Sequence, residues 1–436
     1  MAVAVPLDDT VSQAFRQSIV QELIVSSKAD FRGYSKPIDI YPYDVVDNIA
    51  YIPFYYGNQK LRKYPNDSIV FSKKERKFTG VLREYQKEVV QDAVKRLNAV
   101  RCVFLSMATG KGKTLTTIFL YTRLGVKGCA LLYRTNLFEQ WTESLEKNVP
   151  GIKIQTLDSR EPIDPDCDFY LINPINVMKR NRRDFKDIGF LIVDEAHALC
   201  SEQFSKSLLY FTPKWCIGLS ATPEKSNELD KIIDLHFGSY FINVPLWVDH
   251  DYYKFSTNLV PPTDKNARGD LDWGAVLKYQ AEHPDRNFWI VKLCMFFRDR
   301  NILVLCKRTI HTTTLTKMLQ DEKESVDYCT GKKKKFNKDA RILVTTFSKS
   351  GVGFDHPKLD MLIVASDVEE MFSQYFGRCV RREDVNPIVI DLVDSLKNLD
   401  RHFATRKTYS ISVGGRIKDF RLSFPEFFKE AEIVFE

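Results

Sequence analysis

Short, almost wholly apolar runs recur along the chain, and helical patterns separate them. The first series of these runs comprises CVFLS (102–106), GCALLY (128–133), DFYLI (168–172), GFLIVD (189–194) and WCIGLS (215–220). Strands that are apolar on both faces are typical of a parallel sheet that is covered by helices on each side. The sequence therefore predicts an α/β domain built on such a sheet.

A second series of apolar runs follows an irregular, proline-containing stretch near the middle of the chain. It comprises NILVLC (301–306), SVDYCT (325–330), RILVT (341–345), MLIVAS (361–366) and PIVIDL (387–392). We expect an α/β protein with two tandem parallel-sheet domains and a small, β-rich N-terminal accessory domain. The predicted parts are the accessory domain 1–78, the first sheet domain 79–250, an interdomain connection 251–285, the second sheet domain 286–400 and a basic C-terminal cap 401–436.

Length and composition agree with this organisation. The 436 residues suffice for two or three domains, and 44% of them are apolar and 28% charged, as in ordinary globular proteins. No run approaches the roughly 20 apolar residues of a membrane span, and the first residues, MAVAVPLDDTVSQ, lack the pattern of a signal peptide. We therefore expect a cytoplasmic protein without membrane contact. Nine cysteines without a CxxC pair argue against a zinc ribbon and a disulfide framework.

The segment SMATGKGKT lies between the first apolar run and a helical pattern, which is the context of a P-loop. Gly110 and Gly112 allow backbone N–H groups to turn inward around phosphate oxygens, and the following helix start adds a positive dipole end. Lys113 would reach the β- and γ-phosphates, and the Thr114 hydroxyl would hold Mg²⁺. Met107 stands where the generic pattern has glycine, and a solvated GKGK turn is the alternative interpretation.

Two acidic residues, Asp194 and Glu195, follow the apolar run FLIV directly. Open α/β sheets bind their ligands at the carboxyl ends of the strands. A P-loop enzyme needs a carboxylate for Mg²⁺ and a second acceptor for the attacking water, and these two residues supply both. The alternative is a helix N-terminus that carries favourable negative charge.

Five motifs stand in order along the chain: TGKGKT (109–114), DEAH (194–197), SATP (220–223), VTTFSKSGVGFD (344–355) and QYFGRCVRR (374–382). This ordered set resembles the motif series of the superfamily 2 helicases over roughly residues 80–395. The DEAH and SATP pair, the phrase GVGFD and the compact size resemble most the phage UvsW-type and XPB-like recombination and repair helicases. The resemblance implies two RecA-like domains with ATP and Mg²⁺ bound between them.

In the first domain, the resemblance implies nucleotide contacts, a metal site, a catalytic carboxylate and coupling residues. The cofactor-binding residues would be Arg83 and Gln86 of LREYQ with Thr109, Gly110, Lys111, Gly112, Lys113 and Thr114. Thr114 and Asp194 would hold Mg²⁺, and Glu195 would orient the water. The residues that couple ATP state to domain closure would be His197, Ser220 and Thr222. In YRTNLFEQW, Arg134 and Thr135 would touch a nucleic-acid backbone.

In the second domain, Gln374, Arg378 and Arg381 match the family pattern QxxGRxxR. The two arginines would stabilise charge on the transferring phosphoryl group, which makes them catalytic. The alternative is a helical arginine paired with an acidic neighbour on a solvated face. The further cofactor-binding residues would be Gly353, Asp355 and Gln374, and the nucleic-acid contacts would be Thr330, Gly331 and Thr346.

A net charge of +7 spread over so long a chain produces only a weak electrostatic field. Local basic runs are therefore more informative about binding of a polyanion. These runs are Lys73-Lys74 with Arg76-Lys77, Lys179-Arg180 with Arg182-Arg183, and Lys332 to Lys335. Each could neutralise phosphates, and each could instead be an ordinary solvated face. Likewise, the aromatic residues of 1–78 could stack on bases or form the core of a small β unit.

We expect an ATP-dependent DNA helicase or translocase, acting as a monomer on branched DNA such as forks, R-loops and four-way junctions. Replication, recombination or repair in a phage or virus is the expected setting. One alternative is an RNA helicase or transcript-release motor of a virus. Others are an ATPase that translocates on duplex without unwinding it, and a non-catalytic clamp that uses ATP only as a conformational ligand.

Overall fold

The computed structural model describes the chain except for residues 9–11, 27–38, 109, 200–201, 222–229, 268, 334, 347–355, 357, 369–371, 381, 383 and 431–436. Side chains at 136, 198, 199, 202, 203, 230, 374 and 430 also lie outside the description. The chain divides into two compact units, unit 1 (Met1–Pro245) and unit 2 (Leu246–Glu436). Among the described residues, no helix combines the length and hydropathy that a bilayer span requires.

Unit 1 contains a seven-stranded sheet in which every pairing is parallel. Its spatial order is β12 (Phe241–Val244), β6 (Cys102–Met107), β11 (Trp215–Ser220), β10 (Phe190–Val193), β7 (Gly128–Leu131), β9 (Phe169–Ile172) and β8 (Ile154–Leu157). The first series of apolar runs thus forms strands of one parallel sheet, as predicted.

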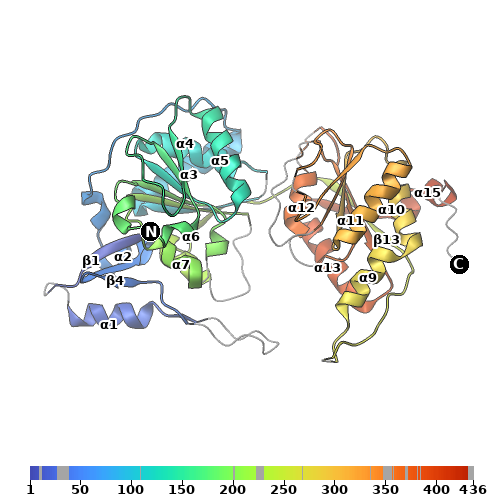
Figure 1. The fold of residues 1–436 in the computed structure, drawn as a ribbon, viewed down its shortest axis with the longest axis horizontal. Helices are drawn as coiled ribbons and strands as arrows, with labels where there is room; N and C mark the ends of the chain where they lie inside the picture. Colours follow the sequence, from blue (N-terminus) through green and yellow to red (C-terminus); the bar gives the residue numbers. More distant parts are fainter. Residues whose placement is uncertain are drawn as a thin grey trace. The chain divides into compact units, whose positions relative to one another are not determined.

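Helices cover both faces of this sheet (Figure 1). Along β6, Val103 and Leu105 pack in the same core as α3 (Glu84–Val100), α4 (Lys113–Leu124) and α5 (Thr135–Asn148). Cys102 and Phe104 point to the opposite face, because successive side chains of a strand alternate. The remaining helices of unit 1 are α1 (Gln13–Glu22), α2 (Phe54–Leu61), α6 (Pro174–Val177), α7 (Glu202–Leu208) and α8 (Asp230–Phe237), with 3₁₀ turns at Pro65–Ser68, Arg182–Phe185 and Ala196–Leu199.

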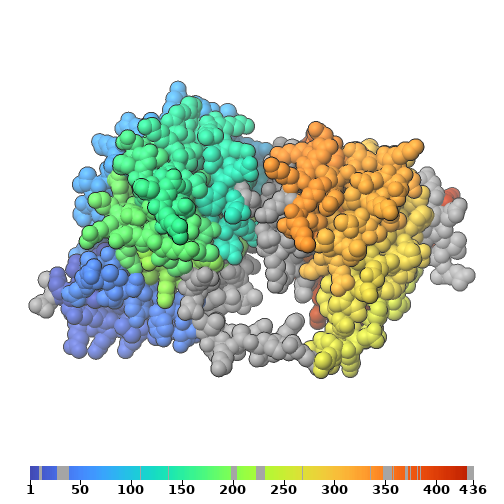
Figure 2. Space-filling model, in the orientation of Figure 1, coloured from blue at the N-terminus to red at the C-terminus, as the bar shows by residue number. Residues whose placement is uncertain are grey.

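The N-terminal residues form a small antiparallel sheet, which confirms a strand-rich accessory element. Its order is β1 (Ala2–Pro6), β5 (Ile49–Pro53) and β4 (Asp44–Val46), and a two-residue ladder joins β2 (Val25–Ser26) to β3 (Asp39–Ile40). This sheet shares one hydrophobic core with the large sheet, since Val3, Ile52 and Phe54 cluster with Phe104. Figure 2 shows the blue N-terminal residues directly against the green part of unit 1. The described residues of this element therefore belong to unit 1 and pack into its core.

Unit 2 contains a second seven-stranded parallel sheet. Its order is β15 (Val326–Cys329), β16 (Ile342–Thr346), β14 (Ile302–Cys306), β17 (Met361–Val364), β18 (Ile388–Val393), β13 (His250–Ser256) and β19 (Gly415–Asp419). Its helices are α9 (Trp273–Glu282), α10 (Pro284–Phe296), α11 (Thr309–Asp321), α12 (Phe372–Cys379), α13 (Lys397–Ser412), α14 (Phe420–Ser423) and α15 (Pro425–Glu430). Two tandem parallel-sheet units are the predicted fold class.

Two predicted boundaries of unit 2 are wrong. The expected connection 251–285 contains most of β13, which lies between β18 and β19, together with helix α9. The expected basic cap 401–436 contributes strand β19 to the same sheet. Its arginine Arg406 is buried, because its guanidinium bonds both oxygens of Asp391 at 2.8 and 3.0 Å and reaches Asp367 at 3.0 Å. Part of the basic charge of this segment is thus neutralised by buried aspartates within unit 2.

Candidate functional site

Three neighbouring strands of unit 1 carry predicted site residues at their carboxyl ends. Strand β11 lies between β6 and β10, and all three run parallel. The P-loop follows β6, Ser220 is the last residue of β11, and the pair Asp194–Glu195 follows β10. Because parallel strands end at the same edge, the fold brings these separate motifs together at one edge of the sheet.

The P-loop turns back on itself directly after β6. The Lys111 N–H donates to the Ala108 carbonyl at 3.1 Å, and Gly110 and Gly112 have φ values of 83° and 76°. Lys113 is the first residue of α4, and its ammonium donates to the Met107 carbonyl at 3.0 Å. The loop therefore presents backbone N–H groups, a helix N-terminus and a lysine at one place, which suits a polyphosphate.

Gln86 supports this loop from α3. Its side chain is 2% exposed, and its amide nitrogen donates to the Lys111 and Gly112 carbonyls, both at 3.3 Å. A Cβ atom on Gly112 would lie 2.3 Å from that nitrogen, so the left-handed conformation and the close approach both require glycine. The Tyr85 hydroxyl also donates to the Lys111 carbonyl, at 3.1 Å. The glutamine and the tyrosine thus hold the P-loop backbone.

Asp194 is buried at the end of β10. The Trp141 indole N–H donates to one carboxylate oxygen at 2.8 Å, and the Glu195 N–H donates to the other at 2.9 Å. Burial, and then the negative charge of Glu195, raises the pKa of Asp194 to about 6, while the Trp141 hydrogen bond and the Lys113 charge oppose this rise. A carboxylate that two donors hold in one orientation near a lysine fits a role as metal ligand.

Glu195 begins a chain of polar side chains that leads to β11. Its backbone has a φ of 49°, which turns the chain sharply after the strand. A carboxylate oxygen lies 3.4 Å from His197 Nδ1, and the same nitrogen lies 2.9 Å from the Ser220 hydroxyl oxygen. The structure therefore brings together the predicted catalytic carboxylate and two of the three predicted coupling residues.

The remaining predicted residues of unit 1 lie beside this edge or outside the description. Thr114 is the second residue of α4 and is partly exposed. Arg134 is the N-cap residue of α5, and Thr135, the first residue of that helix, is exposed. Arg83 precedes α3 and is exposed. Thr109 and Thr222 lie outside the described residues.

In unit 2, the structure brings Thr346 and Arg378 to one place. Thr346 ends β16 and is buried, and the Tyr375 hydroxyl donates to its carbonyl at 3.4 Å. The Arg378 guanidinium lies 5.9 Å from the centre of the Tyr375 ring. The residues outside the description are Gly353, Asp355, Arg381 and the side chain of Gln374.

Thr330 faces its own loop. It is 3% exposed, and its hydroxyl accepts the Lys333 N–H at 3.2 Å, while its own N–H donates to the Lys333 carbonyl at 2.9 Å. The Lys333 ammonium in turn pairs with Asp327. In this loop Gly331, Lys332 and Lys335 are exposed. A nucleic-acid strand that approached this loop would therefore contact Gly331, Lys332 and Lys335 before it reached the Thr330 side chain.

Arg182 and the described cysteines have structural roles. Arg182 pairs with Asp44 and lies 4.3 Å from the ring centres of both Tyr51 and Tyr210. This arginine thus fastens the small sheet to the rest of unit 1, as a structural residue would. All eight cysteines in the described ranges are buried and free, as expected of small apolar side chains.

Sequence reasoning missed Trp141 as a site residue. It lies within helix α5, and only the tertiary fold shows that its N–H reaches Asp194. An apolar ring on a helix face gives no signal of such a bond, so no pattern in the sequence could have found it.

Comparison with known proteins identifies the family. A family model described as the res subunit of type III restriction enzymes matches residues 79–225. Protein 161L of Invertebrate iridescent virus 6, which carries the name of a helicase, is 32% identical over 436 residues, with 93% of this chain and 97% of that protein covered. The chain belongs to the superfamily 2 helicases. This helicase is therefore an ATP-using enzyme, as the P-loop and the DEAH motif predict.

Two further comparisons extend this result. Protein L396 of Acanthamoeba polyphaga mimivirus, named as an ATP-dependent RNA helicase, is 25% identical over 372 residues, which cover 80% of the helicase described here and 71% of L396. The structure of S. cerevisiae Dbp5 bound to RNA and ADP BeF3 matches with a TM-score of 0.54 at 14% identity, over 79% of this chain and 92% of that one. The latter likeness confirms the tandem RecA-like fold.

Proposed function

We propose that this helicase is a nucleic-acid-stimulated ATPase that moves on DNA and remodels branched DNA, such as forks, R-loops and four-way junctions. The observation that carries the proposal is the meeting of the P-loop, Asp194–Glu195 and Ser220 at one edge of the first sheet. A motor needs its phosphate site, its water-orienting carboxylate and its coupling residues within reach of one another. The DEAH and SATP pair and the phrase GVGFD, which resemble those of UvsW-type helicases, support the branched-DNA setting.

The residues at this edge fit Mg·ATP. The Gly110 and Gly112 turns leave backbone N–H groups for phosphate oxygens, and Lys113 adds a positive charge. Thr114 and Asp194 would hold the metal, through a hydroxyl and a carboxylate. Bound Mg·ATP supplies the γ-phosphoryl group that water attacks. Arg83, Gln86, Lys111 and Thr109 complete the proposed nucleotide site.

Glu195 orients the attacking water and takes up its proton, and the His197 ring lies 3.4 Å from its carboxylate. His197 also contacts the Ser220 hydroxyl, so a displacement at Ser220 would reach the side chain beside the catalytic carboxylate. Together with Thr222, this contact would couple ATP state to the grip on nucleic acid. In unit 2, Arg378 and Arg381 would stabilise the developing phosphoryl charge, with Gln374, Gly353 and Asp355 as further nucleotide contacts.

The proposed nucleic-acid contacts are Arg134 and Thr135 in unit 1 and Thr330, Gly331 and Thr346 in unit 2. Thr135 and Gly331 are exposed and suit contact with a phosphate backbone, whereas the side chains of Thr330 and Thr346 are buried. We further propose a monomer that acts in the cytoplasm of a host cell.

The test compares ATP hydrolysis in the presence of single-stranded DNA, RNA and a four-way DNA junction, at one stated salt concentration. Strongest stimulation by the junction, with branch migration of it, supports the proposal. Stimulation by RNA alone contradicts the DNA assignment and favours the second candidate, an RNA-directed or transcript-release motor. The name of the relative L396 favours that candidate.

A further inference from the structure

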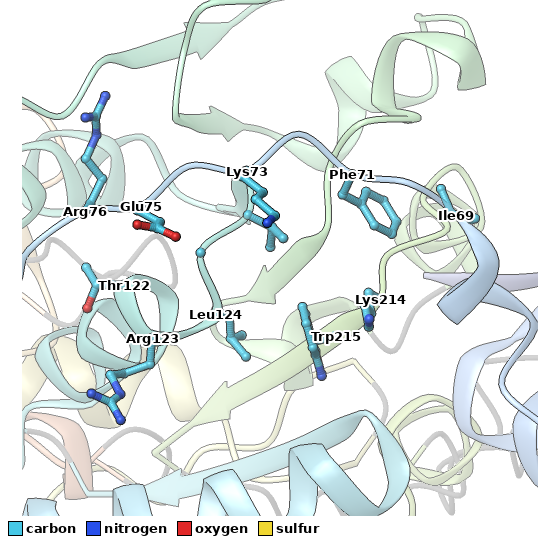
Figure 3. A pocket seen from close by; sticks show the side chains of 12 residues that line it. Ile69, Phe71, Lys73, Glu75, Arg76, Thr122, Arg123, Leu124, Lys214 and Trp215 are labelled. Carbon is cyan, nitrogen blue, oxygen red and sulfur yellow. The ribbon is translucent and has the colours of Figure 1, made fainter.

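A groove lies at the edge of the first sheet where helix α4 ends and strand β11 begins (Figure 3). Residues 69–78, which we call the strap, cross in extended conformation beside the last residues of α4 and the first residue of β11. Between them is a cavity of about 560 Å³, and a second cavity of about 530 Å³ continues along the strap. The two cavities share lining residues, so together they form one open groove, which we call the strap groove.

The basic run of the strap divides into an inward and an outward half. Lys74 and Arg76 both turn to the buried carboxylate of Asp168, at 3.4 and 2.6 Å. Lys73 and Lys77 alternate with them and are exposed, because neighbouring side chains of an extended segment point to opposite sides. Among the described residues, no ion pair involves the ammonium groups of Lys73 and Lys77. Lys73 and Lys77 are therefore available to pair with the negative charges of a ligand.

Two more cationic side chains line the side of the strap groove that faces the strap. Arg123 is exposed in the last turn of α4, and the Lys214 ammonium lies 4.8 Å from the centre of the Trp215 ring. In Figure 3, Phe71 and Lys73 extend from the strap toward Trp215. The one acidic residue lining either cavity is Glu75. Cationic side chains on both sides of a groove, together with aromatic rings, are the features of a surface that binds single-stranded nucleic acid.

We propose that the strap groove is a second binding site for a single-stranded segment of nucleic acid, in addition to the contacts at the carboxyl edge of the sheets. Phosphates would pair with Lys73, Arg123 and Lys214, and bases would pack on Phe71 and Trp215. This inference rests on the proposed function, since the motor contacts already bring a strand to the chain at high effective concentration. An acidic peptide would match the cations without using the flat aromatic surfaces.

Two elements of the fold join the strap groove to the nucleotide edge. Helix α4 begins at Lys113 in the P-loop and ends beside the groove at Leu124. Strand β11 begins at Trp215 in the groove and ends at Ser220 beside His197. The groove is thus one element away from the P-loop and from the coupling residues, yet none of its lining residues belongs to the proposed nucleotide site.

The test is the triple variant Lys73→Gln, Arg123→Gln, Lys214→Gln in the full chain. Its matched control is Lys60→Gln, Lys63→Gln, Lys95→Gln, which removes three exposed lysines of unit 1 outside the groove. Binding of a fork with a long single-stranded tail is measured by fluorescence anisotropy over a range of salt concentrations. We expect the slope of log affinity against log salt to become shallower by about 2, at about 0.7 per lost phosphate contact, and the control to change little.

Other measurements separate the groove from the motor. A strand of about 10 nucleotides, the footprint of a single site, should stimulate ATP hydrolysis equally in the triple variant and the unaltered chain. A tail containing 5-iododeoxyuridine should crosslink to Phe71 or Trp215, which mass spectrometry detects without any ATPase activity. An unchanged salt slope with no crosslink overturns the groove proposal. So does displacement of the tail from the groove by a polyglutamate peptide of equal length at equal concentration. Loss of ATPase stimulation by every nucleic acid, with the crosslink intact, refutes the proposed motor function instead.

Discussion

The replacement of Asp194 by asparagine distinguishes the contribution of this residue to ATP hydrolysis from its effect on the stability of the protein. The carboxyl group is 5% exposed, and burial followed by the Glu195 charge raises its pKa from 3.8 to about 6. At neutral pH the group is ionised in a place that disfavours its charge. Asparagine keeps nearly the same shape without the charge, so we expect Asp194→Asn to abolish ATP turnover and to stabilise the protein.

The size of the stabilisation follows from the pKa and the hydrogen bonds. A rise from 3.8 to about 6 corresponds to about 3 kcal/mol of unfavourable ionisation at neutral pH. The Trp141 indole and the Glu195 N–H now donate to separate oxygens, and an amide offers only one, so the variant loses about 1 kcal/mol. The net gain is about 2 kcal/mol, which raises Tm by about 4 to 8 °C for a unit of this length.

The gain should depend on pH in a defined direction. Because the folded state has the higher pKa, it retains a proton that the unfolded chain releases between pH 3.8 and about 6. The contribution of Asp194 to stability is thus fully present below pH 3.8 and is lost as pH rises through about 6. Asp194→Asn does not lose stability in this way as pH rises. The difference in stability between the variant and the unaltered protein should therefore be largest at pH 7 to 8 and smallest toward pH 4.

Thermal unfolding of the full chain and of the variant, at a series of pH values from 5 to 8, measures this difference. The control is Asp92→Asn, which removes a solvent-exposed carboxylate of α3 in the same unit and should leave Tm nearly unchanged. A variant that is less stable than the unaltered protein at pH 8, or equally stabilised at every pH, would refute the reasoning.

Three further substitutions test single contacts. Glu195→Gln should retain nucleotide binding, measured with a fluorescent ATP analogue, and lose at least about 100-fold in turnover, because the water loses its base; unimpaired hydrolysis would remove Glu195 from its role. Gly112→Ala should lose nucleotide binding and about 1 to 3 kcal/mol of stability in urea unfolding, because φ is 76° and the Cβ would lie 2.3 Å from Gln86. Ser220→Ala should lose most nucleic-acid stimulation of ATP hydrolysis, because His197 loses its 2.9 Å contact; retained stimulation would contradict the coupling role.

The sequence pattern was sufficient for most of the two large sheets, because fully buried parallel strands are apolar at nearly every position. It failed at β13, whose His250, Asp251 and Lys254 are polar. Their side chains pair with distant residues: His250 contacts the Ser410 hydroxyl at 2.7 Å, and Asp251 pairs with Arg416 at 3.0 Å. A strand that satisfies its polar groups through tertiary contacts does not show the hydrophobic pattern.

The motifs located the candidate site along the chain, and the fold supplied its supporting contacts. The P-loop and Asp194 were found from short-range patterns whose chemistry requires fixed spacing, and Ser220 was assigned from the resemblance to the superfamily 2 motif series. The Trp141 hydrogen bond to Asp194 and the inward direction of Thr330 depend on helix and loop packing across many residues. The N-terminal sheet was recognised as strand-rich, but its shared core with Phe104 could be seen only in three dimensions.

We propose that nucleic acid controls ATP hydrolysis at the edge formed by β6, β11 and β10. The most direct test is the steady-state rate of ATP hydrolysis by the full chain with and without a saturating four-way DNA junction, single-stranded DNA or RNA. We expect a rate that rises at least about 10-fold with nucleic acid, which is a change of about 1.4 kcal/mol in the barrier, and we expect Lys113→Ala to abolish hydrolysis. A rate that is the same in the presence and absence of every nucleic acid would contradict it.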